Sequence, residues 1–226
     1  MMRRKLRAEA ARPEIVEDMP DLPRERRLGD ILELDDIHVE FAPDLVNMVL
    51  DPGTGLDARI ANMGTHVASV FGLILPEIRL TDHPGLPTGT YVLRIQGVEQ
   101  ARAILQPDQI LALKPEEPAT LPAGQDTVEP VYGAPARWIS DRDQEKASLA
   151  GATLVTPTEI LATHLLEIVK RNFSRLLTLK SLRRLLAEMV NVSDPARAEA
   201  NRKLLDELIP DKVPTDVLHA VLRLLL

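Results

Sequence analysis

Residues 152–161 decide the fold class, and they read Ala-Thr-Leu-Val-Thr-Pro-Thr-Glu-Ile-Leu. The short apolar run at residues 152–155 predicts a β-strand. Immediately after it, Thr156 can cap a helix, Pro157 suits the first helical position, and Glu159 stands three residues beyond the cap. A strand that passes directly into a capped helix indicates mixed α and β structure.

The predicted helix continues as an apolar stripe at helical spacing. From there to the end of the chain the apolar residues keep a helical period, with stops at residues 193–195 and at Pro210. This part is therefore expected to be helical. The stripe that begins it consists of Ile160, Leu161, Leu165, Ile168 and Val169.

Upstream of the quoted stretch, strand and helix patterns alternate. Residues 36–41 alternate apolar and polar side chains, and residues 45–50 form a second apolar run, so both predict strands. Asp57 can cap a helix that Gly72 would end in left-handed geometry. The apolar positions of that helix are Leu56, Ile60, Met63, Val67 and Phe71.

Shorter runs follow, separated by turns rich in proline and glycine. A small β insertion is expected around the proline-rich loop at residues 115–122. Residues 141–150 predict a helix that ends at Gly151. The further predicted strands are residues 74–80, 91–95, 110–113 and 137–139.

Both ends of the chain differ from the middle. Residues 1–28 mix basic and acidic runs with prolines and few apolar side chains, a composition that predicts a flexible linker. The last residues, 221–226, form an apolar helical run with no stop signal, which predicts that the natural protein continues beyond it. We therefore expect a truncated piece of a longer protein.

Composition excludes several classes of function. The chain has no cysteine, so disulfides, thiolate metal ligands and a cysteine nucleophile are excluded. A net charge of −7 argues against nucleic acid as a partner, because that affinity comes from Lys and Arg on phosphates. The sequence has no apolar stretch of the roughly 20 residues needed to cross a bilayer, so this piece is expected to be soluble.

Catalytic and ligand-binding motifs are missing from the sequence. The histidines stand singly, whereas metal sites usually pair their ligands. His164 and Glu167 lie one turn apart on the predicted helix and could form the acid–base pair of a small hydrolase. The alternative is an ordinary contact on a helix surface, and we favour it. We expect no enzyme activity, no cofactor, no metal and no small-molecule substrate.

Four segments together carry a resemblance, which covers nearly the whole chain in order from residue 28 onward. The chain resembles the FHIPEP family of flagellar type III export gates. The segments are 86–92 (Leu-Pro-Thr-Gly-Thr-Tyr-Val), 94–99 (Arg-Ile-Gln-Gly-Val-Glu), 129–139 (Glu-Pro-Val-Tyr-Gly-Ala-Pro-Ala-Arg-Trp-Ile) and 157–165 (Pro-Thr-Glu-Ile-Leu-Ala-Thr-His-Leu).

The resemblance implies an α+β multidomain fold on the cytoplasmic face of the bacterial inner membrane. A thioredoxin-like first subdomain would carry a small β insertion and be followed by an incomplete helical subdomain. Without cysteine, this thioredoxin-like fold would have no redox chemistry. The implied boundaries are a linker at 1–28, the first subdomain at 29–106 and 149–176, the insertion at 107–148 and the helical subdomain at 177–226.

The resemblance also implies a docking function. Family members form a nine-membered ring below the membrane gate, work with other export apparatus proteins, and receive export chaperones that carry late flagellar substrates. Their docking residues match Glu129, Tyr132 and Thr163, where many members carry Asp and Phe at the first two positions. The equivalent gate of a virulence injectisome is the alternative.

Two aromatic residues and one glycine remain to be weighed. Tyr132 could be a docking anchor or part of the core of the insertion, and we favour the anchor. For Trp138 we favour the core. Gly64 lies in a predicted helix where the family often has a basic residue, and nothing in the sequence explains it.

Overall fold

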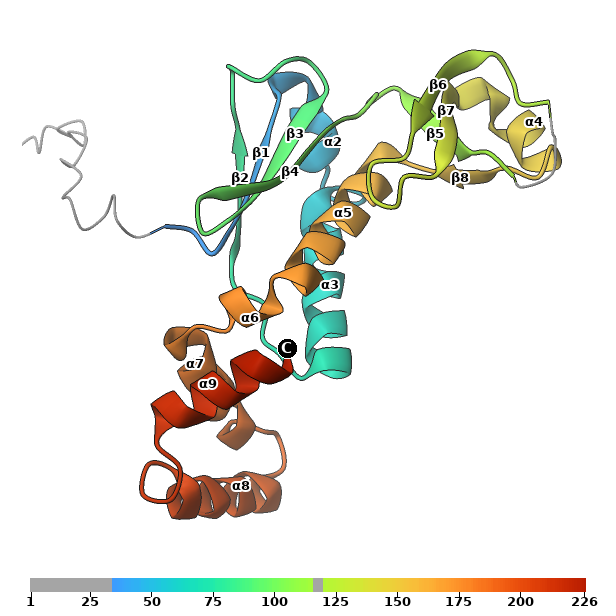
Figure 1. Cartoon of the computed structure of the whole chain (residues 1–226). Coiled ribbons are helices and arrows are strands. Elements are labelled where there is room, and N and C mark those ends of the chain that lie inside the picture. The colour runs from blue at the N-terminus through green and yellow to red at the C-terminus, as the bar shows by residue number, and fades with distance from the viewer. Residues whose placement is uncertain (1–33, 116–119) are drawn as a thin grey trace, which may run out of the picture. The chain divides into compact units, whose positions relative to one another are not determined.

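The computed structural model describes residues 34–115 and 120–226. The predicted linker at 1–28 lies outside the described residues. Two four-stranded sheets and the helices around them make up the described part (Figure 1). The prediction of mixed α and β structure is confirmed.

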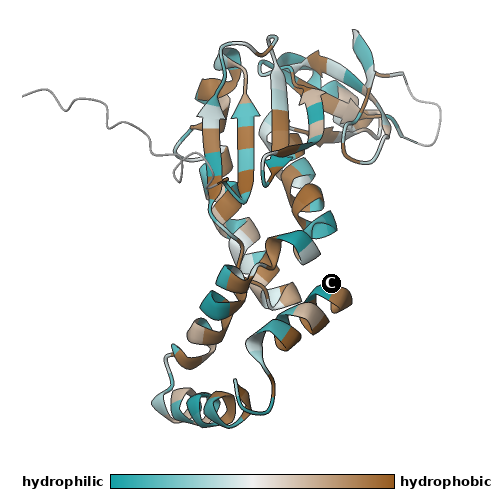
Figure 2. Cartoon of the chain, turned by 60° about the vertical axis from the view of Figure 1, so that its left-hand side comes forward, coloured by the Kyte–Doolittle hydropathy of each residue, from teal (hydrophilic) through white to brown (hydrophobic). Residues whose placement is uncertain are grey.

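The first sheet has the strand order β2-β1-β3-β4. Strand β1 pairs in parallel with β2, whereas β3 is antiparallel to both β1 and β4. The alternation predicted at residues 36–41 is observed, since every second side chain of β1 is buried. Figure 2 shows the same alternation as hydrophobic and hydrophilic bands along strands. The strands are β1 (Ile37–Phe41), β2 (Ile78–Asp82), β3 (Thr90–Ile95) and β4 (Val98–Ile104).

Helices α3 (Leu56–Phe71) and α5 (Pro157–Arg171) pack against each other and supply the helical half of the main core. Gly72 ends α3 in left-handed geometry with φ of 66°, as predicted. The predicted capping box of α5 is present: the Thr156 hydroxyl accepts from the Glu159 main chain at 3.2 Å, and the Glu159 carboxylate accepts from the Thr156 main chain at 2.9 Å.

The second sheet has the order β6-β7-β5-β8, and all its pairs are antiparallel. Helix α4 (Gln144–Leu149) contributes Ala147 to a small core with Ile110 and Ile139. The opposite face carries Leu111 and Trp138 into the main core. The strands are β5 (Gln109–Leu113), β6 (Gly124–Val128), β7 (Pro135–Ser140) and β8 (Thr153–Val155).

Three local predictions differ from the structure. Residues 45–50 form no strand, because Pro43 starts a 3₁₀ turn (Pro43–Leu45) that continues as helix α2 (Val46–Val49). Gly55, not Asp57, is the N-cap of α3, and Asp57 lies in its first turn. Residues 149–155 were expected in the first subdomain, but β8 hydrogen bonds to β5 in the second sheet.

Strands β4 and β6 were not predicted, and both are edge strands. No residue of either strand is buried, so neither carries the large buried side chains that mark a core strand. The expected helix at residues 141–150 is a 3₁₀ turn (Asp141–Asp143) followed by α4.

The remaining helices form the helical end of the described chain. Helix α7 contacts α8 and α9, and α9 contacts α6. The His219 ring hydrogen bonds to the Leu177 carbonyl at 2.6 Å, and Arg223 donates to the Ser174 carbonyl at 2.8 Å. These helices are α6 (Phe173–Leu176), α7 (Leu179–Val190), α8 (Pro195–Leu208) and α9 (Thr215–Leu225).

The described residues form neither a membrane-spanning helix nor a metal cluster. No helix in these ranges is both long and apolar enough to cross a membrane. Nor do residues 34–115 and 120–226 hold a cluster of three or more His, Asp or Glu side chains suited to a metal ion.

Candidate docking surface

The candidate surface is built on the loop between β6 and β7, which Figure 1 shows beside α5. The Glu129 main chain closes this loop, since its N–H donates to the Ala134 carbonyl at 2.8 Å and its carbonyl accepts from Gly133 at 3.0 Å. Gly133 has φ of 76°, a left-handed conformation that favours glycine. The glycine is therefore required by the turn that follows Tyr132.

Glu129 is buried, with 6% of its surface exposed. One carboxylate oxygen accepts from the Val131 N–H at 2.8 Å, and the other accepts from the Tyr132 N–H at 2.7 Å. Both oxygens are thus engaged by the main chain of the loop itself. The carboxylate holds the segment that presents Tyr132.

Tyr132 is 68% exposed, whereas Trp138 is 5% exposed. The expected core role of Trp138 is confirmed. Desolvation, followed by the negative charge of Glu167 on α5 and a hydrogen bond to it, raises the pKa of the Tyr132 phenol. The aromatic side chain therefore lies beside α5 and remains open to solvent, as a docking anchor requires.

Thr163 is half-buried on α5. It precedes Glu167 by one helical turn, so the two side chains share a face of the helix. Because Tyr132 interacts with Glu167, the structure brings Tyr132 to the face of α5 that carries Thr163. Glu129 contributes indirectly, because its carboxylate holds the main chain of the loop that carries Tyr132.

A buried hydrogen bond lies below this surface and was not predicted. The hydroxyl of Tyr91, which is fully buried, lies 2.7 Å from Nδ1 of His164. Burial lowers the pKa of His164 and outweighs the opposing influence of the Glu129 carboxylate. Burial likewise raises the pKa of Tyr91. The strand predicted at residues 91–95 includes Tyr91, but its hydrogen-bond partner is 73 residues away in sequence.

His164 and Glu167 each have another partner. His164 bonds to Tyr91, while Glu167 forms an ion pair with Lys170 at 2.7 Å. The hydrogen bond from Lys170 lowers the pKa of Glu167, which is the wrong direction for a general acid. Their geometry matches the helix-surface alternative better than an acid–base pair.

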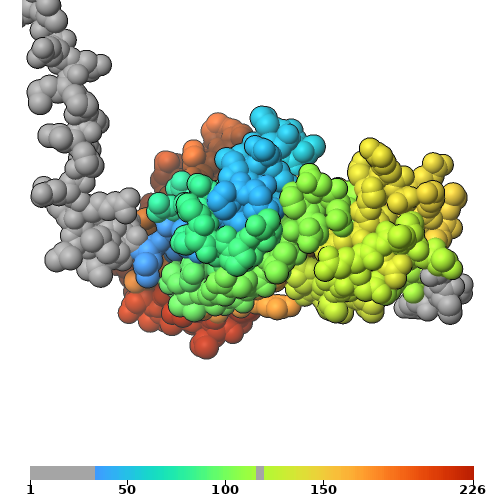
Figure 3. All heavy atoms as spheres, turned by 90° about the horizontal axis from the view of Figure 1, so that it is seen from above, coloured from blue at the N-terminus to red at the C-terminus, as the bar shows by residue number. Residues whose placement is uncertain are grey.

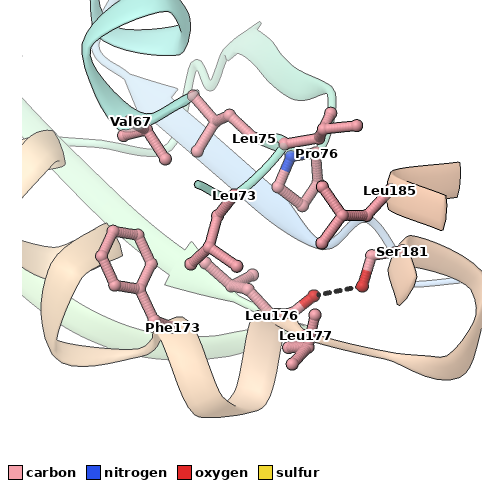
Figure 4. Close-up of a pocket in the computed structure, with 10 residues that line it drawn as sticks. Val67, Leu73, Leu75, Pro76, Phe173, Leu176, Leu177, Ser181 and Leu185 are labelled. Carbon is pink, nitrogen blue, oxygen red and sulfur yellow. Dashed lines mark hydrogen bonds between the residues drawn. The ribbon is translucent and has the colours of Figure 1, made fainter. Parts of the chain in front are cut away.

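A separate, small apolar pocket of about 20 Å³ lies where α3, α6 and α7 meet. Figure 4 shows Leu73, Phe173 and Leu185 around it, and the Ser181 hydroxyl donates to the Leu176 carbonyl at 3.0 Å. Because Ser181 is engaged with the main chain, this lining offers packing and no evident chemistry.

Comparison with known sequences gives consistent matches. The model of the FHIPEP family matches residues 1–226. The flagellar biosynthesis protein FlhA of Caulobacter vibrioides is 31% identical over 208 residues, which cover 92% of this chain and 29% of that protein. The Bacillus subtilis FlhA is 29% identical and covers 92% of this chain and 30% of that protein. The chain thus spans less than a third of the length of these relatives.

Solved structures share the fold. The Chlamydia pneumoniae CdsV protein, in a complex with CdsO, aligns with a TM-score of 0.62 at 21% identity, covering 81% of this chain and 57% of that one. The nonameric cytosolic domain of EscV from a type III secretion system aligns with a TM-score of 0.55 at 14% identity, covering 85% of this chain and 53% of that one.

Proposed function

This chain belongs to the FHIPEP family, and on that premise we propose that it is the docking platform of a flagellar type III protein export gate. Its partners would be export chaperones that carry late flagellar substrates. The work of transport would be done elsewhere, by a partner ATPase and by the membrane part of the gate. The role is one of binding, with no catalysis by His164 and Glu167.

One observation carries this proposal: an exposed tyrosine stands on a loop that is fixed by the buried Glu129, beside the helix face of Thr163. Buried aromatic anchors at interfaces contribute about 2 kcal/mol or more each. A helical segment of a chaperone could lay its apolar face against α5 and cover Tyr132. The sequence motif and the geometry thus favour the same surface.

Sequence identity favours the flagellar branch over an injectisome gate. The matched flagellar relatives are 28–34% identical to this chain. The CdsV and EscV structures, at 21% and 14% identity, support a common fold only. We therefore place the injectisome gate second.

We further propose that the complete protein forms a ring of nine subunits on the cytoplasmic face of the inner membrane. The cytosolic domain of EscV, a nonamer with a similar fold, supports this proposal. Contact with other export proteins is supported by the CdsV–CdsO complex. The thioredoxin-like description of the first subdomain also remains a proposal.

The test is a calorimetric titration of the chain with a purified flagellar chaperone bound to its late substrate. Tyr132→Asp and Thr163→Asp should each abolish micromolar binding. Glu129→Gln should weaken it, because an amide holds the two loop N–H groups less well than a carboxylate does. Leu149→Asp, at a position 83% exposed on α4, is the matched control and should bind normally. Equal binding by the parent chain and Tyr132→Asp would contradict the proposal.

A further inference from the structure

A groove of about 350 Å³ lies between the first and second sheets. Figure 3 shows the surfaces of the two sheets bordering each other on one face of the molecule. The volume falls in the range of pockets that hold ligands. The lining residues are Arg102, Ala103, Ile104, Leu111, Thr127, Val128, Pro130 and Trp138.

One wall of the groove is the edge of strand β4. Three consecutive residues of β4, Arg102 to Ile104, line it. Successive side chains of a strand point to opposite faces, so three in a row border a groove only along the edge. Within the described residues the first sheet ends at β4, so this edge has no neighbouring strand.

The register shows which main-chain groups face the groove. Leu105 donates to the Gly89 carbonyl at 2.8 Å, which makes these two residues a hydrogen-bonded pair. Such pairs alternate with non-bonded pairs in an antiparallel ladder. The N–H and C=O groups of Ile104 and Arg102, which stand opposite Thr90 and Val92, therefore point away from β3 and toward the groove.

The floor of the groove is apolar. Leu111 and Trp138 are cross-strand neighbours on β5 and β7, with 0% and 5% of their surfaces exposed. Ile104 and Val128 are exposed apolar side chains at the rim. Arg102 is held in two hydrogen bonds by Glu99, at 3.0 and 3.1 Å, so its charge is already paired. The lining therefore suits an uncharged, apolar segment.

We propose that this groove binds an extended segment of the exported protein as an added strand along β4. Repeated outward N–H and C=O groups recognise the main chain of a peptide, and an apolar floor accepts every second side chain. Small molecules would leave the row of main-chain groups unpaired. Ile104 and Val128, which are exposed at the rim, contact the side chains of the bound segment, and the largely buried Trp138 of the floor reports the change in its surroundings.

The groove adjoins the loop that carries the candidate docking surface. Pro130 lines the groove and belongs to the same loop as Tyr132. A chaperone complex that covers Tyr132 would hold its unfolded cargo within reach of β4. The choice of an exported protein as the occupant thus rests on the proposed function, whereas recognition of an extended peptide rests on the strand edge alone.

The test uses the fluorescence of Trp138, the single tryptophan of the sequence, in the full chain. The probe is a short capped peptide of alternating Val and Thr without aromatic residues. We expect a saturable change in Trp138 emission. Ile104→Pro removes one outward N–H and should weaken binding about tenfold, since proline is tolerated on strand edges. Ile104→Thr, which keeps that N–H, should weaken it about threefold or less.

A second measurement does not depend on the folding of a variant. Two forms of the peptide are used, one N-methylated at the Val positions and the other at the Thr positions. They lose the N–H groups on opposite edges of the peptide strand. One form should bind like the parent peptide and the other should not. The proposal is overturned if the parent peptide gives no saturable change, if Ile104→Pro and Ile104→Thr bind equally, or if both methylated forms bind like the parent.

The Tyr132→Asp variant separates the two proposals. It should still bind the peptide while it loses the chaperone complex. Peptide binding without chaperone binding by the parent chain would remove the docking function and keep the groove. Chaperone binding without peptide binding would keep the docking function and remove the groove as a peptide site.

Discussion

The sheet region and the helical end of this chain differ in how deeply they bury their apolar side chains. Helix α5 buries eight residues, among them Leu161 and Leu165. Helix α7 buries Leu182, and α8 and α9, which are described over their whole length, bury none. Yet α7 and α9 are clearly amphipathic in sequence. An apolar stripe thus predicts a helix, while the depth of burial depends on what lies opposite it.

Matched leucine substitutions should give the largest difference in stability between the two regions. Leu161→Ala removes a fully buried side chain from α5 and should lower the free energy of unfolding by about 2–5 kcal/mol. Leu204→Ala, at a position 52% exposed on α8, should change it by less than about 0.5 kcal/mol. Urea unfolding followed by circular dichroism measures both. Similar losses would mean that the helical end is packed as tightly as the sheet region.

Helix caps give a smaller contrast. Thr156→Ala removes a capping box and should cost about 1–2 kcal/mol in the same assay. Asp194→Ala removes the exposed cap of α8, which accepts from Ala196 at 3.0 Å, and should cost about 0.5–1 kcal/mol. Hydrogen exchange should show faster opening confined to α8 in the second variant. Global loss of protection in Asp194→Ala would contradict the difference between the regions.

Gly64→Ala should sharpen the comparison by stabilising the sheet region. A Cβ built at Gly64 meets no atom within 4 Å, and the residue lies in mid-helix of α3. Alanine should therefore raise the free energy of unfolding by about 0.5–1 kcal/mol. A thermal melt measures this gain, and a loss of stability would show that the site needs glycine for a reason outside the packing.

Acidification should give the smallest effect, and it should arise in the sheet region. Burial lowers the folded-state pKa of His164 and of His38, so the unfolded chain binds more protons there. The stability they contribute is complete above the unfolded pKa of about 6.5 and is lost as the pH falls below it.

Denaturant midpoints between pH 7.5 and 5 test this expectation. His164→Gln should reduce the slope without removing it, because His38 remains. An unchanged slope in His164→Gln would contradict the assignment.

Features that depend on neighbours in sequence were predicted well. The capping box from Thr156 to Glu159 and the left-handed end of α3 at Gly72 follow from local backbone chemistry. The strand predicted at residues 45–50 was wrong, because a short apolar run suits a strand or a buried helix equally. Pro43 favoured the helix. Edge strands β4 and β6 were not predicted because neither buries a side chain, and so neither carries the large apolar residues that mark a core strand.

The candidate site could be predicted only in part. Glu129, Tyr132 and Thr163 came from a motif, and the structure shows how the first two are held in one loop. A charged residue next to a proline gives no sign of burial, so the burial of Glu129 could not be predicted from the sequence. The Tyr91–His164 pair also depends on distant packing, since a strand and a helix must meet to form it.

The Glu129 carboxylate accepts hydrogen bonds from two main-chain N–H groups of its own loop, and these bonds affect the rate and the entropy of recognition. A partner that reaches Tyr132 meets a loop whose backbone is already in one conformation, so association spends little free energy on ordering that segment. The dissociation rate would then be the main determinant of affinity. Variants at Tyr132 would change the residence time of the complex more than its association rate.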